Sequence, residues 1–410
     1  MDLEDTKAEA EYRAKVRAFL DAHAEKRVRG AAPAPSRGID AEALTRAKAW
    51  QAKKAEAGFA GIRWPEEWGG QGGGPIEEVI YTQEEAKYTV PRGVFEIGLG
   101  MCLPTMIAYA TKEQLERYTG PALRGEEVWC QLFSEPASGS DLAGLRTRAV
   151  RDGDEWVING QKIWTSGAHL SDYGILLTRT DPTVPKHKGL TMFFIDMHAP
   201  GVEVRPIHQM SGASHFNEVF FTDLRVPDAH RLGAVGDGWR VALTTLMNER
   251  LAVGDEPRPD VEDLIAFLEE FEIDGVPAIR TPVVRDRLAD IYARSAGVKN
   301  ARFRAITALS RGETPGPEAS IGRLVNAMKQ QEIARLALEL MGAGGMVSDP
   351  DTALRAGSFQ QSLLAAPGQR IAGGTSEILR NIIAERVLGL PGDPRVDKDV
   401  PFQDIGRGRY

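Results

Sequence analysis

The pattern of apolar and polar residues divides the chain into three sections. In the first, from Leu3 to about Glu127, apolar residues recur at helical spacing in charge-laced segments such as AEALTRAKAWQAKKAEAG and TMIAYATKEQLERY. The stretches GGQGGGP and TVPRG lie between such segments and are typical of loops. We therefore predict a helical domain over residues 1–127.

From about Trp129 to Gly236 the pattern favours strands. WVINGQKIW has two alternating apolar arms around Asn159-Gly160, the dipeptide that favours a tight primed turn, and it predicts a hairpin. Gly, Pro, Asp and Ser separate four further predicted strands: YGILLT, GLTMFFIDM, VEVRPI and NEVFFTDLRVP. We expect a β domain over residues 128–236.

Helical periodicity returns from about Gly238. The predicted helices are WRVALTTLMNERLAV, VEDLIAFLEEF, a long segment around 283–311, PEASIGRLVNAMKQQEIARLALELMG and TSEILRNIIAERVLG. The predicted fold class is therefore α+β. An N-terminal helical domain precedes a sandwich- or barrel-like β domain, and a C-terminal helical bundle covers residues 237–410.

Composition narrows the functional classes. The 410 residues, 42% apolar and 26% charged, are ordinary for a soluble globular protein of two to three domains. A net charge of −8 argues against a nucleic-acid partner, and the absence of an 18-residue apolar run argues against membrane insertion. Cys102 and Cys130 have no metal-ligand spacing, so we expect no metal site, and so few thiols favour a reducing, cytoplasmic location.

The stretch QRIAGGTSEILR, residues 369–380, is typical of a helix N-terminus that faces a ligand. Gly373 and Gly374 permit close backbone approach, and Thr375 or Ser376 can cap the helix that follows. The turn itself contains no acid, base or nucleophile. No G-x-G-x-x-G motif follows a strand and no Walker A motif occurs, which disfavours a Rossmann enzyme.

Two other stretches each allow two interpretations. In LFSEPASGSDLAG, residues 132–144, Ser138, Gly139 and Ser140 could form a nest for a phosphate or a flavin edge, or Ser140 or Asp141 could simply start a turn. Trp164 could bind a ligand or belong to the core.

Glu249 is a candidate general base. It shares a helical face with four apolar residues: Ala242, Leu246, Ala252 and Val253. A carboxylate desolvated there would have a raised pKa, which suits proton abstraction near neutral pH. The alternative is a carboxylate at the edge of this face that pairs with a nearby Arg or Lys.

Taken together, these motifs resemble the acyl-CoA dehydrogenase family. SEPASGSDLAG, INGQKIWTSG, NEVFFTDLRVP, GWRVALTTLMNER, GAGGMV and AGGTSEILRN occur in the order and spacing of that family. The resemblance covers nearly the whole chain, including a PTMIAYATKEQLERY helix before the β domain. It implies an FAD-dependent enzyme acting on acyl-CoA, with electron-transfer flavoprotein as the acceptor. It also implies a homotetramer or homodimer, or a heterotetramer.

The same resemblance implies roles for individual residues. Leu132, Phe133 and Ser134 would approach the flavin ring. Trp164 would pack against this ring, and Ser166 would form a hydrogen bond near the flavin N5 atom. Gly139 and Ser140 would lie near the phosphates and the thioester end. Thr375 would also bind the cofactor. Ser140 and Arg250 would bind the substrate.

The implied reaction is concerted dehydrogenation of an acyl-CoA thioester to the trans-2-enoyl-CoA. Many members carry their catalytic glutamate at the position that is Gly373 here, whereas isovaleryl- and long-chain-type members carry it at the position of Glu249. Glu249 would then remove the α-proton while hydride passes to flavin N5. The Gly373 N–H and a flavin hydroxyl would bind the thioester oxygen. Glu377 is a rival carboxylate, which we expect to serve the helix N-terminus.

The chain also departs from the family. An Arg-x-x-Phe segment that reaches a neighbouring subunit's FAD cannot be placed in FEIDGVPAIRTPVVRDRLAD, and Glu339 replaces a cofactor-contacting glutamine. A carboxylate near the pyrophosphate of FAD disfavours FAD binding unless the carboxylate is paired with a cation or turned away. Two alternatives therefore stay open: a non-catalytic subunit of a heterotetramer, and a flavin monooxygenase or oxidase on the same scaffold.

Overall fold

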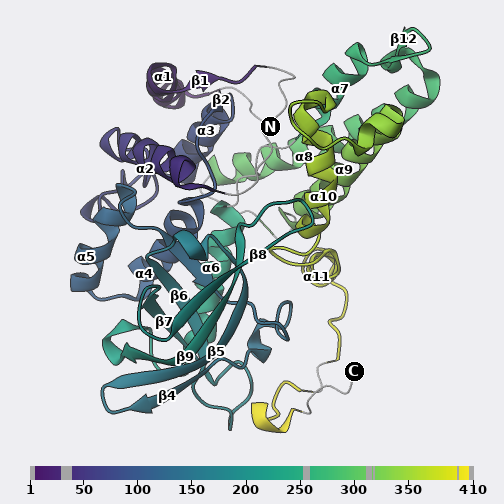
Figure 1. The fold of residues 1–410 in the computed structure, drawn as a ribbon. Coiled ribbons are helices and arrows are strands. Elements are labelled where there is room, and N and C mark those ends of the chain that lie inside the picture. Colours follow the sequence, from purple (N-terminus) through teal and green to yellow (C-terminus); the bar gives the residue numbers. More distant parts are fainter. Residues whose placement is uncertain are drawn as a thin grey trace. The chain divides into compact units, whose positions relative to one another are not determined.

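A computed structural model of the protein describes residues 5–28, 39–252, 259–310, 316, 319–394 and 397–405. The chain forms two compact units, each assembled from three separate segments (Figure 1). Unit 1 consists of Met1–Arg37, Gly74–Val90 and Asp255–Gly392. Unit 2 consists of Gly38–Gly73, Pro91–Gly254 and Asp393–Tyr410.

Unit 1 is helical. Its helices are α1 (Lys7–His23), α3 (Pro75–Glu85), α7 (Val261–Glu270), α8 (Pro282–Ser310), α9 (Ala319–Met341), α10 (Ser358–Gln369) and α11 (Ser376–Ile382). Two small ribbons pair β1 (Glu25–Lys26) with β2 (Tyr88–Thr89) and β11 (Glu272–Ile273) with β12 (Val276–Pro277). Helices α7 to α10 pack around a shared apolar core that includes Leu264, Phe267, Ile333, Leu336 and Phe359.

Unit 2 combines helices with one sheet of eight strands. Its helices are α2 (Ala41–Glu56), α4 (Leu103–Tyr109), α5 (Lys112–Leu123) and α6 (Gly238–Ala252). The strands are β3 (Trp129–Leu132), β4 (Arg148–Asp152), β5 (Glu155–Ser166), β6 (Tyr173–Arg179), β7 (Leu190–Asp196), β8 (Val202–Ile207), β9 (Phe216–Pro227) and β10 (Arg231–Leu232). The sheet order is β10-β7-β6-β4-β5-β9-β8, and β3 pairs parallel to β6.

Successive side chains of β7 enter two different cores because strand side chains alternate between faces. Met192 and Phe194 join the core shared with residues of α4, α5 and α6, whereas Phe193 and Ile195 join the core against the other face. Helix α6 therefore lies on one face of the sheet, beside β7 (Figure 1). The predicted order of helices, sheet and helices along the chain is confirmed.

The hairpin predicted at Asn159-Gly160 is wrong. Strand β5 runs straight through this dipeptide, with a change of register against β9 between Ile158 and Gly160. The Asn159 side chain donates to the Asp223 carboxylate across the strands at 2.9 Å. Glycine is required at 160 because a Cβ there would lie 2.7 Å from the Cα of Thr147. The turn between β4 and β5 instead contains Gly153, at φ 63°.

Three further segments differ from the sequence prediction. The single helix expected over PTMIAYATKEQLERY is two helices, α4 and α5, because Ala110 is extended and Thr111 caps α5 by accepting a hydrogen bond from the Gln114 N–H. Helix α10 was not predicted. A tight two-residue turn does occur, but at Asp274-Gly275 between β11 and β12, where both residues have positive φ.

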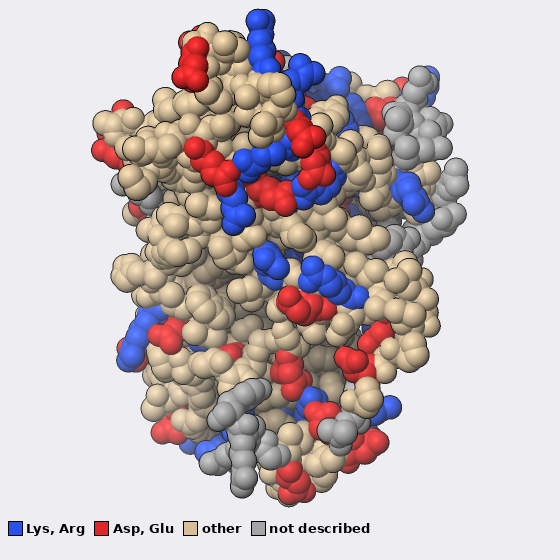
Figure 2. All heavy atoms as spheres, turned by 90° about the vertical axis from the view of Figure 1, so that its right-hand side faces the viewer, with Lys and Arg blue, Asp and Glu red and all other residues tan. Residues whose placement is uncertain are grey.

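The surface is mixed in charge. On the face drawn in Figure 2, the described Lys and Arg side chains are interspersed with Asp and Glu side chains. None of the helices in the described ranges combines the length and apolar character that crossing a membrane requires.

Candidate active site

The loop that follows β3 is fastened to β5 through its main chain. The N–H of Ile163 donates to the Ser134 carbonyl at 2.9 Å. The fully buried Lys162 ammonium donates to the Phe133 carbonyl and to the Glu135 carboxylate, each at 2.9 Å. Residues 133–135 are therefore held against the strand position just before Trp164.

Glu135 forms the centre of this buried network. Besides Lys162, its carboxylate accepts hydrogen bonds from the N–H groups of Arg146 at 2.6 Å and Thr147 at 2.9 Å. Burial pushes the pKa of Glu135 upward, but Lys162 and these hydrogen bonds outweigh burial and lower the pKa. Burial lowers the pKa of Lys162, and the facing carboxylate opposes that change. The result is a buried ion pair that fixes the loop to β5 and to the two residues just before β4.

The predicted residues of this loop divide into inward-facing and outward-facing ones. Ser138 is 3% exposed, and its hydroxyl donates to the Asp141 carbonyl, so this side chain serves the loop itself. Gly139 and Ser140 are exposed, and their N–H groups donate to no other residue in the described ranges. A Cβ at Gly139 would meet no atom within 4 Å. Gly139 and Ser140 therefore present two free donors on an open surface.

Leu132 and Phe133 both bury their side chains. They are 0% and 5% exposed and pack in the cores on opposite faces of the sheet. Ser134 is half-buried. A ligand beside this segment would therefore contact the main chain and Ser134 rather than the two apolar side chains.

Trp164 has an unusual backbone and an unusual exposure. Its φ is 60°, in the left-handed region that costs a non-glycine residue about 1–2 kcal/mol, and its side chain is 55% exposed. The indole meets Phe216 edge-on with ring centroids 5.9 Å apart. Ser166 pairs with Phe216 on β9 and is half-buried. Strain that exposes an aromatic face is typical of a binding site rather than of a core.

A second group of predicted residues lies in unit 1, at the start of α11. Gly373 and Gly374 have φ values of 61° and 104°, and the Thr375 hydroxyl caps α11 by accepting from the Ile378 N–H at 3.2 Å. Glu377 is in the first turn of that helix, where a hydrogen bond from its own N–H lowers its pKa. Glu377 thus serves the helix N-terminus, as expected.

Arg323 of α9 lies directly against Gly373 and was missed by sequence reasoning. Its Nη2 donates to the Ala372 carbonyl at 2.7 Å, and a Cβ at position 373 would lie 2.1 Å from that Nη2. The Arg323 Nε is buried without a partner within the described part of the chain. Nothing in the sequence around residue 323 indicates this contact, because only the packing of α9 against the 370–375 turn creates it.

Glu249 and Arg250 belong to α6, but their side chains lie outside the described residues. The preceding turns of α6 bury Ala242 and Thr245, and the Thr245 hydroxyl is 2.9 Å from that of Thr105. In the sequence, position 249 follows Ala242 by seven residues and Thr245 by four, and such spacings place residues on one face of a regular helix.

The two cofactor-related departures in unit 1 have clear local structures. The segment in which no Arg-x-x-Phe motif could be placed begins at the end of α7, forms the β11–β12 hairpin and continues into α8. Glu339 accepts a hydrogen bond from Arg287 at 2.6 Å, so its carboxylate is paired.

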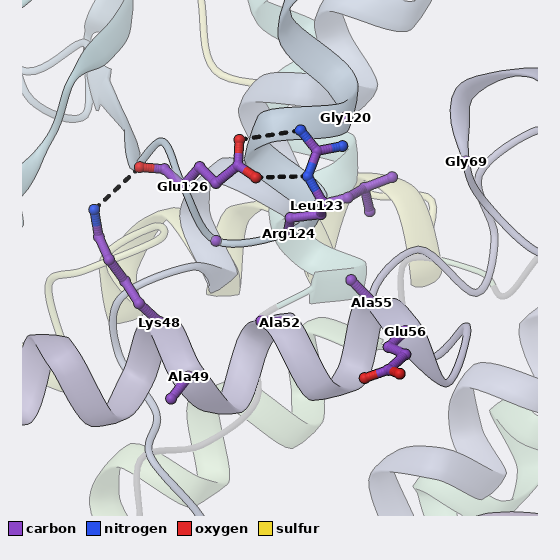
Figure 3. Close-up of a pocket in the computed structure, with 11 residues that line it drawn as sticks. Lys48, Ala49, Ala52, Ala55, Glu56, Gly69, Gly120, Leu123, Arg124 and Glu126 are labelled. Carbon is purple, nitrogen blue, oxygen red and sulfur yellow. Dashed lines mark hydrogen bonds and ion pairs between the residues drawn. The ribbon is translucent and has the colours of Figure 1, made fainter.

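A groove of about 610 Å³ lies between α2 and α5 (Figure 3). The residues that line it include Ala49, Ala52 and Ala55 of α2, and Lys48, which also lines it, donates to the Glu126 carbonyl at 3.0 Å. None of the residues predicted to bind cofactor or substrate lines this groove.

Comparison with known proteins identifies the family. Three family models match in chain order: the acyl-CoA dehydrogenase N-terminal domain over residues 6–126, its middle domain over 130–224 and its C-terminal domain over 236–388. Among similar proteins of Mycobacterium tuberculosis, acyl-CoA dehydrogenase FadE34 is 41% identical over 344 residues, which are 83% of this chain and 46% of FadE34. The chain thus spans about half the length of that relative.

Acyl-CoA dehydrogenase IpdE1 of the same organism is 38% identical over 87% of this chain and 91% of its own length. Among solved structures, the steroid ACAD Tcur3481-Tcur3483 matches with a TM-score of 0.79 and 29% identity over 96% of this chain and all of that chain. The ChsE4-ChsE5 complex from Mycobacterium tuberculosis matches with a TM-score of 0.76 and 27% identity over the same shares. The chain therefore belongs to the acyl-CoA dehydrogenase family of FAD-dependent oxidoreductases.

Proposed function

We propose that this protein oxidises the Cα–Cβ bond of a bulky, ring-bearing acyl-CoA thioester and releases the trans-2-enoyl-CoA. The observation that carries the flavin-dependent reaction type is the position of Trp164. Its exposed indole follows directly after Ile163, the residue whose N–H anchors Ser134. The exposed aromatic face of Trp164 thus follows directly after the point at which the start of the 133–145 loop is fastened to β5.

The residues predicted to bind the cofactor have chemistry that suits FAD. The indole offers a face for a flavin ring, and the free N–H groups of Gly139 and Ser140 are donors suited to phosphate oxygens. Leu132 and Phe133 would contribute main-chain contacts, and Ser134, Ser166 and Thr375 would add polar ones. When bound, FAD would accept the hydride that leaves the β-carbon.

Proton removal is assigned to Glu249. Position 373 carries no side chain, and Arg323 occupies the space in which one would stand. By its sequence spacing from Ala242 and Thr245, Glu249 is the carboxylate that takes the α-proton, while the Gly373 N–H donates to the thioester oxygen as negative charge develops there. Ser140 and Arg250 bind the substrate.

Substitution of Glu249 tests the assignment of the base. In Glu249→Gln we expect FAD to remain bound and the rate of flavin reduction by acyl-CoA to fall by at least about a hundredfold, since general-base catalysis contributes that much. Glu377→Gln is the matched control because Glu377 is exposed in the first turn of α11. Near-normal reduction in Glu249→Gln would remove Glu249 from this role.

The substrate class is inferred from the similarity to a steroid ACAD over nearly the whole chain. We expect a steroid-derived acyl-CoA to bleach the flavin band under anaerobic conditions faster than butyryl-CoA or palmitoyl-CoA does. If palmitoyl-CoA bleaches the flavin band fastest, the substrate is a straight-chain acyl-CoA rather than a ring-bearing one. The proposed reaction type would still stand.

We also infer a heteromeric assembly with a related, non-identical chain. FadE34 is about twice as long as the region that matches this chain, and one structural neighbour is a complex of two named proteins, ChsE4 and ChsE5. The β11–β12 hairpin in place of an Arg-x-x-Phe segment favours cofactor contacts that come from such a partner. Flavin content and light-scattering mass, measured for the chain alone and with a candidate partner, test this inference.

The acceptor we propose is electron-transfer flavoprotein, and the proposed location is the cytoplasm. Cys102 and Cys130 are free and buried, which suits a reducing compartment. Rapid reoxidation of the reduced flavin by oxygen would favour an oxidase or monooxygenase instead. A colourless chain that FAD does not reconstitute would favour a non-catalytic subunit.

A further inference from the structure

The C-terminal residues 397–405 attach to the loop between β6 and β7. The Phe402 N–H donates to the Val184 carbonyl and the Gln403 N–H to the Pro182 carbonyl, each at 2.9 Å. Pro401 forms an isolated bridge with Pro185. We call residues 397–405 the strap. The strap belongs to unit 2, although α11, which precedes it in the sequence, belongs to unit 1.

Beneath the strap, Arg179 of β6 holds the far end of the 139–145 loop. Its guanidinium donates to the carbonyls of Ala143 at 2.5 Å and Leu145 at 3.1 Å. The Phe402 ring covers this guanidinium, with the Arg179 Cζ 3.5 Å from the ring centroid. A cation over an aromatic face is stabilised further when it is shielded from water, and Arg179 is only 4% exposed.

A second cation, Lys186, joins the strap to the near end of the same loop. Its ammonium lies 2.9 Å from the Asp141 carboxylate and 2.6 Å from the Asp397 carboxylate. The Lys186 side chain is 12% exposed, so both contacts are partly shielded from water. The strap therefore reaches the 139–145 loop by two routes, from Asp397 through Lys186 and from Phe402 through Arg179.

We propose that the strap holds the 139–145 loop in the shape that binds the phosphates of FAD, with Asp397 and Phe402 as positioning residues. This inference rests on the proposed function, which assigns Gly139 and Ser140 to the cofactor. The N–H groups of these two residues have no partner inside the described protein, so their orientation depends on the anchored residues that follow them. Anchoring the loop in advance reduces the ordering cost of binding and raises affinity.

The test uses Phe402→Ala and Asp397→Asn in the full chain, with Asp404→Asn as the matched control. No side-chain contact of Asp404 is found among the described residues, and this carboxylate belongs to the same strap. Hydrogen exchange of the 139–145 amides is measured in the FAD-free protein, and FAD affinity is measured by flavin fluorescence. We expect both variants to speed exchange in the loop and to weaken FAD binding by about tenfold, which corresponds to about 1.4 kcal/mol. At saturating FAD, kcat should remain within about twofold of the unchanged protein.

Loop exchange and FAD affinity equal to those of Asp404→Asn would overturn the strap proposal. So would faster exchange with unchanged FAD affinity, because the strap would then be merely structural. If Phe402→Ala does not fold, Asp397→Asn decides by the same two measurements. If the unchanged protein binds no FAD with or without a partner, the proposed function fails, whereas the exchange measurement still reports whether the strap orders the loop.

Discussion

The guanidinium of Arg323 occupies the space into which a side chain at position 373 would project. A Cβ built on Gly373 lies 2.1 Å from the Arg323 Nη2 and 2.4 Å from its Cζ, and the Gly373 φ of 61° is itself left-handed. Glycine is thus required here by its neighbour and by its own backbone. A base at 373 would demand that Arg323 leave.

We predict that Gly373→Ala lowers the free energy of unfolding by about 1–3 kcal/mol, of which the left-handed backbone accounts for about 1–2 kcal/mol. In the double variant with Arg323→Ala, the part of this lost free energy that comes from the clash with Arg323 should be recovered. The part that comes from the left-handed backbone should remain lost. Urea denaturation of the single and double variants measures both. Purely additive effects in the two variants would show that Arg323 does not restrict position 373.

Trp164→Gly should separate cofactor binding from stability. Relief of the left-handed strain offsets the lost contact with Phe216, which is worth about 0.5–1.5 kcal/mol, so the unfolding free energy of the FAD-free protein should change by less than about 1 kcal/mol. FAD affinity should fall by about tenfold or more because the exposed ring is lost. Trp164→Phe, which keeps a ring, is the control. Unchanged FAD affinity in Trp164→Gly would exclude this indole from the cofactor site.

The buried pair of Glu135 and Lys162 predicts a strongly coupled double-mutant cycle. Glu135→Gln leaves Lys162 buried without a counter-charge and should cost about 3–5 kcal/mol of unfolding free energy. Lys162→Met should also destabilise, because it leaves the buried carboxylate unpaired. The double variant should be more stable than the sum of the two losses predicts. Denaturant unfolding checks this, and additive losses would contradict an ion pair.

Glu84 of α3 predicts a specific loss of stability in acid. Burial pushes its pKa upward, but hydrogen bonds from Arg17, Lys87 and Arg13 outweigh burial and lower the pKa from 4.5 to about 2. A lowered folded-state pKa stabilises the protein above pH 4.5, and this stabilisation is lost as the pH falls towards 2. The stability advantage over Glu84→Gln should therefore shrink by up to about 3 kcal/mol across that range.

Unfolding measured in urea at several pH values in this window checks the Glu84 prediction. The matched control is Glu11→Gln, since Glu11 is exposed on α1 and no ion pair of it is found among the described residues. A constant difference between Glu84→Gln and the unchanged protein would show that Glu84 does not titrate in this way.

The sequence by itself determined the class of fold and several local structures, because these depend on residues close together in the chain. The apolar pattern of LTMFFID suits a strand buried on both faces, and β7 sends Phe193 and Phe194 to opposite cores. Thr375 caps α11 because its hydroxyl lies three residues before the Ile378 N–H. The domain boundaries at 127 and 236, and the roles given to the site residues, stay predictions.

Only the tertiary structure decided the features that depend on distant neighbours. Asn159-Gly160 and Asp274-Gly275 carry similar turn signals, yet the first lies inside β5 and the second forms the turn. Across the strands, Asp223 binds the Asn159 side chain and the Thr147 backbone packs on Gly160. Arg323 and the strap are likewise visible only in the fold, since their partners lie tens to hundreds of residues away. Local propensity is a weak preference, and contacts between segments outweigh it where the chain packs against itself.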